Sequence, residues 1–205
     1  MDRGLLIDFE GIDGAGKSTQ AEMTLGYLAS RGIPVRLLRE PTKGQHGSMI
    51  REILSGMAPR GTPEDELELF IRDRMEDVRE NIEPALSSGD IILIDRYYYS
   101  TMAYQGALGL DVEMIRKRNE SFAPRPALVL IFLIPVEEGL ARIRAKRQKG
   151  TDGYEKESFL RKVDEIFRSF KGPNIRFIDS QRPLDEVQEE VRVLVDSLIR
   201  EKGYC

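Results

Sequence analysis

The sequence of 205 residues has one cysteine, one histidine and no tryptophan. Cys205 by itself cannot form a disulfide within the chain or a cysteine-rich metal site. His46 by itself excludes histidine-rich zinc sites and most Ser-His catalytic arrangements. These absences remove several common metal centres and nucleophile–base pairs from consideration.

An excess of basic residues and a long apolar run are also missing. Lysine and arginine number 31 against 35 acidic residues, which gives a formal net charge of −4. A nucleic-acid partner normally requires the opposite balance, although a local site for a small anion stays compatible with it. No apolar run approaches the about 18–20 residues of a membrane span, and Asp8 and Glu10 interrupt the first apolar segment. We therefore expect a soluble, cytoplasmic protein with no nucleic-acid or membrane partner.

The apolar segments that are present are short and alternate with helical patterns. With 40% hydrophobic and 32% charged residues, the composition is that of one folded domain, residues 1–205. Strands are predicted at 5–9, 34–38, 91–95, 127–133 and 175–179. Helices are predicted at 17–31, 46–55, 62–86, 98–122, 136–148 and 155–170 and at the end of the chain. Strands separated by helices indicate an α/β fold, here a three-layer α/β/α arrangement around a five-stranded parallel sheet.

Three closely spaced glycines lie between the first predicted strand and helix. Residues 11–18 read GIDGAGKS and match the phosphate-loop pattern G-x-x-x-x-G-K-[ST]. Glycines let successive backbone N–H groups surround phosphate oxygens, and the helix N-terminus adds partial positive charge. The alternative is a tight turn with a solvated lysine. The pattern predicts an ATP-phosphate site formed by Gly11, Ile12, Asp13, Gly14, Ala15, Gly16, Lys17, Ser18 and Thr19.

Two further features are typical of a nucleotide-binding enzyme. Asp95 ends the strand "IILID" and could hold Mg²⁺ together with the Ser18 hydroxyl, or merely cap the next helix. The segment "RIRAKRQKGTDG" at 142–153 has five basic residues and then two glycines, as in a basic helix end that continues into a mobile loop. The phosphate loop alone does not define the reaction, because GTPases, motor ATPases and small-molecule kinases share it.

Three motifs together narrow the class. "FEGIDGAGKST" at 9–19, "REPT" at 39–42 and "DRYYYSTMAYQG" at 95–106 resemble the thymidylate kinase family, and the resemblance runs from residue 5 to about 185. It implies transfer of the ATP γ-phosphoryl group to dTMP with Mg²⁺. It also implies a small mobile lid at about 142–155 and a homodimer formed through helices of the 45–80 and 98–120 regions.

The resemblance further implies roles on the acceptor side. Phe70 would lie against the thymine ring, Arg96 would grip the acceptor phosphate, and Tyr104 would pack against the deoxyribose. Core packing is the alternative for Phe70, and a surface position is the alternative for Arg51. The implied dTMP-binding set is Asp13, Arg39, Pro41, Arg51, Phe70, Arg74, Arg96, Thr101, Tyr104, Gln105 and Glu155.

The same resemblance bears on the catalytic arginine. Some family members carry it in the phosphate loop, where this chain has Gly14, and others supply it from the lid. The lid type is therefore implied here, with Arg144, Arg147 and Lys149 as candidates and Arg147 first among them. No arginine stands directly before Tyr154 and Glu155, where lid-type relatives often have one, which leaves its identity open. The implied catalytic set is Lys17, Asp13, Arg96, Arg144 and Arg147.

Two expectations follow for the donor side. Arg142 is implied to stack on adenine, with a solvated helix face as the alternative. An arginine introduced at Gly14 is expected to compensate in part for the loss of a lid arginine.

Two other functions stay open from the sequence. One is a kinase for another pyrimidine monophosphate such as dUMP, because single base contacts set preference by only about 1–3 kcal/mol. The other is a nucleotide-dependent switch ATPase without an acceptor pocket. A switch hydrolyses ATP slowly with no monophosphate present, whereas a kinase needs the acceptor.

Overall fold

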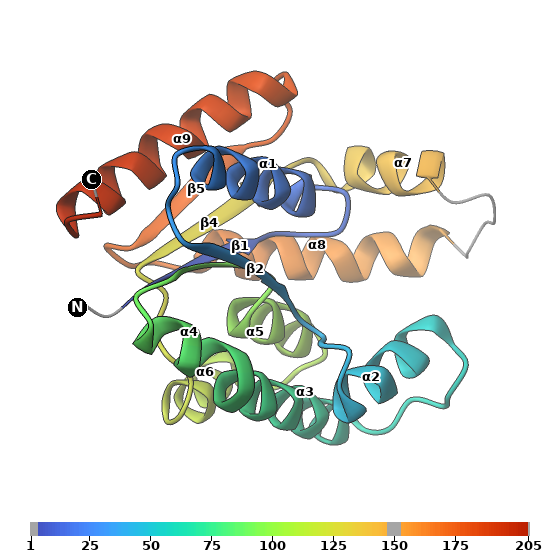
Figure 1. Cartoon of the computed structure of the whole chain (residues 1–205). Helices are drawn as coiled ribbons and strands as arrows, with labels where there is room; N and C mark the ends of the chain where they lie inside the picture. Colours follow the sequence, from blue (N-terminus) through green and yellow to red (C-terminus); the bar gives the residue numbers. More distant parts are fainter. Residues whose placement is uncertain (1–3, 147–152, 205) are drawn as a thin grey trace.

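The protein is described by a computed structural model over residues 4–146 and 153–204. Its centre is a parallel sheet in the order β2-β3-β1-β4-β5 (Figure 1). The strands are β1 (Leu5–Glu10), β2 (Val35–Arg39), β3 (Ile91–Asp95), β4 (Leu128–Leu133) and β5 (Ile175–Asp179). The predicted five-stranded parallel sheet is confirmed, with β2 shifted by one residue from its expected range.

Burial explains the strand order. The central strands β1, β3 and β4 are mostly apolar and are buried along nearly their whole length, as expected for strands covered on both faces. The edge strands β2 and β5 keep exposed positions. The register pairs Asp95 with Phe9 on one side and with Arg39 on the other. The carboxyl ends of three strands therefore meet at one edge of the sheet, where ligands bind in α/β folds.

Helices cover both faces of the sheet. α1 (Lys17–Ser30) and α9 (Leu184–Glu201) lie on one face, and α3 (Pro63–Asp77), α4 (Glu83–Ser87), α5 (Tyr98–Ala107) and α6 (Val112–Glu120) lie on the other (Figure 1). α2 (Gln45–Ser55) packs against α3, and α8 (Gly153–Ser169) packs against α5 and α7 (Val136–Lys146). Within the described residues, no helix combines the length and apolarity that crossing a membrane requires.

Two predicted helices are interrupted. The expected helix 62–86 contains a π-helical segment, Val78–Ile82, between α3 and α4. Pro84 stands at the start of α4 and has no N–H to donate, so the regular ladder cannot pass through it. The expected helix 98–122 ends at Ala107 and restarts at Val112. Asp111 caps the second part, because its carboxylate accepts from the backbone N–H groups of Glu113 and Met114 at 2.8 and 3.0 Å.

Candidate functional site

The phosphate loop joins β1 to α1. Gly14 and Gly16 have φ of 85° and 89°, a conformation that favours glycine, and Gly16 is the N-cap of α1. The Lys17 ammonium donates to the carbonyl of Ile12 at 2.8 Å, so its amine lies over the loop. Burial and, to a smaller extent, the nearby Arg96 together lower the pKa of Lys17 to about 7, against the opposing effect of Asp13. An anion in the loop would restore the full charge of this lysine.

Ser18 and Asp95 meet beside the loop. The Ser18 hydroxyl donates to Asp95 Oδ2 at 2.5 Å, and Arg39 Nη2 lies 2.6 Å from the same oxygen. Arg39 Nη2 also donates to Ser18 Oγ at 2.5 Å. Asp95 is 3% exposed, and its Oδ1 has no hydrogen-bond partner among the described residues. A hydroxyl and a buried carboxylate with an unused oxygen fit Mg²⁺, which typically takes one or two carboxylates and completes its shell with phosphates and water.

Arg96 faces the loop from the start of α5. Its backbone has φ of 73°, a left-handed conformation that non-glycine residues rarely adopt. The guanidinium contacts Asp13 Oδ1 at 2.7 Å, donates to Ser100 Oγ at 2.8 Å and lies 5.1 Å from the centre of the Tyr104 ring. Burial raises the pKa of Tyr104 to about 12, so the hydroxyl stays neutral beside Arg96. This arrangement fixes a permanent cation opposite the phosphate loop.

The buried carboxylate of Glu10 holds the segment that follows Arg96. It accepts from the backbone N–H groups of Tyr97 and Ser100 at 2.8 and 2.9 Å, and from the Ser100 hydroxyl at 2.5 Å. Burial raises the pKa of Glu10, while Arg96 and these hydrogen bonds act in the opposite direction. The start of α5 is thereby fixed to the end of β1.

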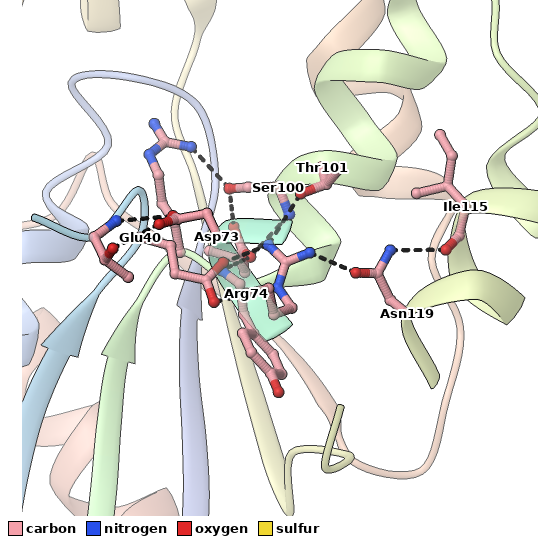
Figure 2. Close-up of polar contacts among 11 residues, drawn as sticks. Glu40, Asp73, Arg74, Ser100, Thr101, Ile115 and Asn119 are labelled. Carbon is pink, nitrogen blue, oxygen red and sulfur yellow. Dashed lines mark hydrogen bonds and ion pairs between the residues drawn. The ribbon is translucent and has the colours of Figure 1, made fainter. Parts of the chain in front are cut away.

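A second buried network surrounds Arg74 (Figure 2). Arg74 is 1% exposed and donates to both carboxylate oxygens of Glu40, with the Nε–Oε1 distance at 3.2 Å. It also donates to Asn119 Oδ1 at 2.5 Å and to Thr101 Oγ1 at 3.1 Å. Burial raises the pKa of Glu40 to about 8, and Arg74 opposes that rise. Arg74 therefore ties together α3, α5, α6 and the segment that follows β2, and it lies inside the protein.

The loop after β2 is held from two sides. Asp73 accepts from the backbone N–H of Thr42 at 2.9 Å and from its hydroxyl at 2.5 Å. Arg51 donates to the carbonyl of Pro41 at 3.2 Å and to that of Thr42. Arg51 is exposed, and its guanidinium holds this loop through the two carbonyl groups.

A cleft of about 620 Å³ opens between the phosphate loop, the end of β2 and α7. Arg142 lines it and donates to Glu138 at 2.7 Å and to the Ser180 carbonyl at 3.1 Å, which links α7 to the segment after β5. The predicted site residues that this cleft brings together are Asp13, Gly14, Gly16, Lys17, Ser18, Thr19, Arg39, Asp95, Arg96 and Arg142.

Other predicted residues lie outside the walls of that cleft. Thr101 and Gln105 are buried on α5, as Arg74 is on α3. Phe70 borders a small apolar pit between α2 and α3. Arg144 is exposed on α7. Arg147, Lys149 and the side chain of Glu155 lie outside the described part of the chain.

Several residues of the site were not predicted from the sequence. Glu40 adjoins Pro41 in the "REPT" motif and Glu10 precedes Gly11, so motif adjacency could have found both. Ser100 lies within the "DRYYYSTMAYQG" motif, which could have found it. Asp73 and Asn119 are ordinary helix residues in the sequence, and no spacing pattern distinguishes them.

The expected effect of an arginine at Gly14 is not supported. A Cβ at this position would lie 2.4 Å from the Gly139 carbonyl oxygen of α7, and φ of +85° strains any side chain there. α7 would have to move before an arginine could enter, so we no longer expect Gly14→Arg to compensate for a lid arginine.

Fold and site together define a P-loop phosphotransferase of the nucleoside monophosphate kinase class. A strand, a glycine-rich loop and a helix hold Lys17, and Arg96 lines the same cleft. A sequence model described as thymidylate kinase matches residues 9–191. The chain belongs to the thymidylate kinase family.

Individual relatives agree along nearly the whole chain. A thymidylate kinase of Desulfotalea psychrophila is 49% identical over 197 residues, which cover 96% of both chains. A probable thymidylate kinase of Archaeoglobus fulgidus is 42% identical over 97% of this chain and 98% of its own. A thymidylate kinase of Akkermansia muciniphila is 43% identical over 93% of this chain and 90% of its own. The motif resemblance in the sequence is thereby confirmed.

Proposed function

We propose that this protein transfers the γ-phosphoryl group of ATP to the 5′-phosphate of dTMP and releases dTDP and ADP. The observation that supports this most directly is the single cleft shared by Lys17 of the phosphate loop and the cationic pair Arg39 and Arg96. A triphosphate and a monophosphate can be held there with their phosphates facing one another.

The residues act by position and charge. The acceptor phosphate is already an anion at neutral pH, so no strong general base is required. Lys17 neutralises the donor phosphates, and Arg96 binds the acceptor phosphate with two parallel N–H groups. Asp13 orients Arg96 through the 2.7 Å contact between them. Together these groups screen the repulsion between two polyanions during transfer.

Ser18 and Asp95 are the residues that would hold Mg²⁺. The unpartnered, buried Asp95 Oδ1 and the adjacent Ser18 hydroxyl suit this role. When bound, the ion supplies charge neutralisation at the donor phosphates. Among the described residues no group of three or more acidic, histidine or cysteine side chains could form a protein-only metal site.

We assign recognition of thymine to side chains of α3 and α5. Phe70, Thr101, Tyr104 and Gln105 form this set, and Arg74 holds Thr101 through its 3.1 Å hydrogen bond. Gln105 is 2% exposed and its Oε1 has no partner among the described residues, so a ligand amide could satisfy it. Arg51 and Pro41 then shape the loop beside the acceptor phosphate.

The lid, the assembly and the location are also proposals. The chain would be one domain in which residues 142–155 form a lid. Arg142 would lie beside adenine, and Glu155 would lie near the acceptor. Arg144 or Arg147 would be the catalytic cation. The protein would be a cytoplasmic homodimer. Met49, Leu54 and Met57 at α2 and Met75 on α3 are 43–76% exposed and supply an apolar face for such an interface.

The proposed function is tested by ATP consumption against dTMP, dUMP, dCMP, dAMP, UMP, CMP, AMP and GMP. We expect dTMP to exceed every other acceptor in kcat/KM by about tenfold or more. Equal turnover with dUMP would indicate the broader pyrimidine kinase. Equal ATP consumption with and without any acceptor would replace the kinase by a switch ATPase.

A further inference from the structure

Arg39 occupies a place that its expected role does not explain. As an acceptor-binding residue it should face the monophosphate, yet Nη2 contacts Asp95 Oδ2 at 2.6 Å and Ser18 Oγ at 2.5 Å. We propose that Arg39 is an exchangeable counter-cation that leaves Ser18 and Asp95 when Mg²⁺·ATP binds and then strengthens acceptor binding. The inference rests on the proposed function and adds a coupling between its two substrates.

The contact itself has a clear physical cause. The Asp95 side chain is only 4% exposed, and a buried carboxylate without a cation or full hydrogen bonding is costly. Arg39 supplies that cation. Its own side chain is 62% exposed, so neither packing nor burial keeps the guanidinium there. A second cation that takes its place at Asp95 would remove the cost of leaving this buried carboxylate uncompensated, so the exposed guanidinium can be exchanged.

Mg²⁺ and Arg39 would compete for Ser18 Oγ, although Asp95 offers a separate oxygen to each of them. The Ser18 hydroxyl and the Asp95 carboxylate are the groups that fit Mg²⁺, and a guanidinium in contact with both would face a divalent charge at contact distance. Arg39 is therefore expected to turn away when a metal is bound at Asp95.

The backbone determines where Arg39 can turn. Its residue pairs with Asp95 across the sheet, and the next residue, Glu40, is anchored by two hydrogen bonds to buried Arg74. Only the side chain is free to move. It lines the same cleft as Asp13 and Arg96, so the released guanidinium remains beside the proposed acceptor phosphate. A second arginine there would reinforce the grip of Arg96.

The coupling must be reciprocal. If Mg²⁺·ATP increases the affinity for dTMP by some factor, dTMP increases the affinity for Mg²⁺·ATP by the same factor. Nucleotide without metal should leave Arg39 at Asp95 and produce little coupling. This distinguishes an exchange at the metal site from a general effect of nucleotide binding.

Calorimetry with a non-hydrolysable ATP analogue tests the proposal in the full-length protein. dTMP is titrated into enzyme alone, enzyme with analogue and Mg²⁺, and enzyme with analogue and EDTA. We expect Mg²⁺ and analogue together to tighten dTMP binding about tenfold in the wild type, and Arg39→Met to reduce that factor to about one. Arg36→Met is the matched control, because Arg36 lies on the same strand, is 56% exposed and pairs with Asp90 at 2.6 Å. It should retain the wild-type factor.

A second titration distinguishes the exchange from a role in which Arg39 simply binds phosphate. The two roles predict opposite changes in the affinity for Mg²⁺ and analogue when Arg39 is replaced. Without dTMP, Arg39→Met should bind Mg²⁺ and analogue about two- to fivefold more tightly than the wild type, because the competing cation is gone. Arg39→Lys keeps a cation and should fall between the two. Weaker binding by Arg39→Met, or an unchanged coupling factor, would overturn the exchange.

Failure of this inference is separable from failure of the proposed function. Wild-type enzyme that phosphorylates dTMP but shows no metal-dependent coupling would refute the exchange alone. Wild-type enzyme that phosphorylates no monophosphate would refute the proposed function, and the exchange with it.

Discussion

Asp8 is a buried acid in the middle of the sheet, and its replacement should stabilise the protein. It lies on β1 opposite Ile94 of β3 and Val129 of β4 and is 0% exposed. Neither carboxyl oxygen has a hydrogen-bond partner among the described residues. Burial raises the pKa of Asp8 well above its usual range, and the neighbouring acids Glu10 and Glu40 raise it further.

The sign of the pH effect follows from proton binding. In the unfolded chain an aspartate ionises near pH 3.9, while the folded protein keeps the Asp8 proton to a higher pH. Between those two pKa values the unfolded state binds fewer protons, so the free energy of unfolding falls as pH rises. The loss is about 1.4 kcal/mol for each pH unit in that window.

Asp8→Val removes both the proton-linked cost and the unpaired polar group. Near pH 4 we expect a gain of about 1–3 kcal/mol in the free energy of unfolding, from the polar group alone. As pH rises above 4 the gain should grow, by up to about 1.4 kcal/mol for each pH unit over which the folded protein keeps the Asp8 proton. Asp8→Asn is the matched control, because it cannot titrate but still buries a polar amide. Its gain in the free energy of unfolding over the wild type should grow with pH, but it should lack the pH-independent gain that comes from removing the polar group.

Urea unfolding followed by circular dichroism at pH 4, 5.5, 6.5 and 7.5 measures these differences. Because Glu10 and Glu40 titrate in the same cluster, the difference between the two variants at each pH isolates the polar group. Asp8→Val that is less stable than the wild type at every pH would refute the reasoning. So would a gain that is independent of pH, since Asp8 would then be ionised and paired in the folded state.

Three further predictions concern the site. At pH 7.5 most Lys17 amines should be neutral in the free enzyme, so ATP binding should be accompanied by uptake of about half a proton or more. Calorimetry in buffers of different ionisation enthalpy measures this uptake, and Lys17→Met should show none. Gly14→Arg should weaken ATP binding about tenfold or more, because its side chain meets Gly139; ATP affinity equal to the wild type would contradict this. Thr42→Val should cost about 1 kcal/mol of stability and raise the KM for dTMP severalfold with the KM for ATP unchanged, because Asp73 loses one of its two hydrogen bonds to the acceptor loop; steady-state kinetics and urea unfolding check it.

The fold and the donor side could be predicted because their signals are local. Short apolar runs alternating with helical patterns identify a covered parallel sheet, and the phosphate loop is a contiguous motif with its own backbone chemistry. The breaks at Val78–Ile82 and around Asp111 were harder, because the apolar periodicity continues through them. Pro84 and Asp111 are the local signals for those breaks.

The buried polar contacts could not be predicted because they join residues far apart in the chain. Arg74 receives support from Glu40 and Asn119, which are 34 and 45 positions away. Each side chain is unremarkable in its own segment, and only the packing of α3, α5 and α6 on one face brings them together. The same holds for Asp8, which in the sequence is a polar interruption of a strand and in the fold is an unpartnered acid between two buried strands.

Ion pairs of two different kinds lie in the interior beside α5 and in the cleft. Arg74 and Glu40 are 1% and 3% exposed, and breaking a buried pair costs about 3–5 kcal/mol. Arg39 and Asp13 are 62% and 50% exposed, and their pairs with buried or half-buried partners cost far less to exchange. Substrate binding should therefore rearrange the exposed pairs at the phosphates while the loop behind the acceptor keeps its conformation. A substitution at Glu40 should consequently lower both stability and dTMP affinity, whereas one at Arg39 should change binding and cost less stability than the Glu40 substitution.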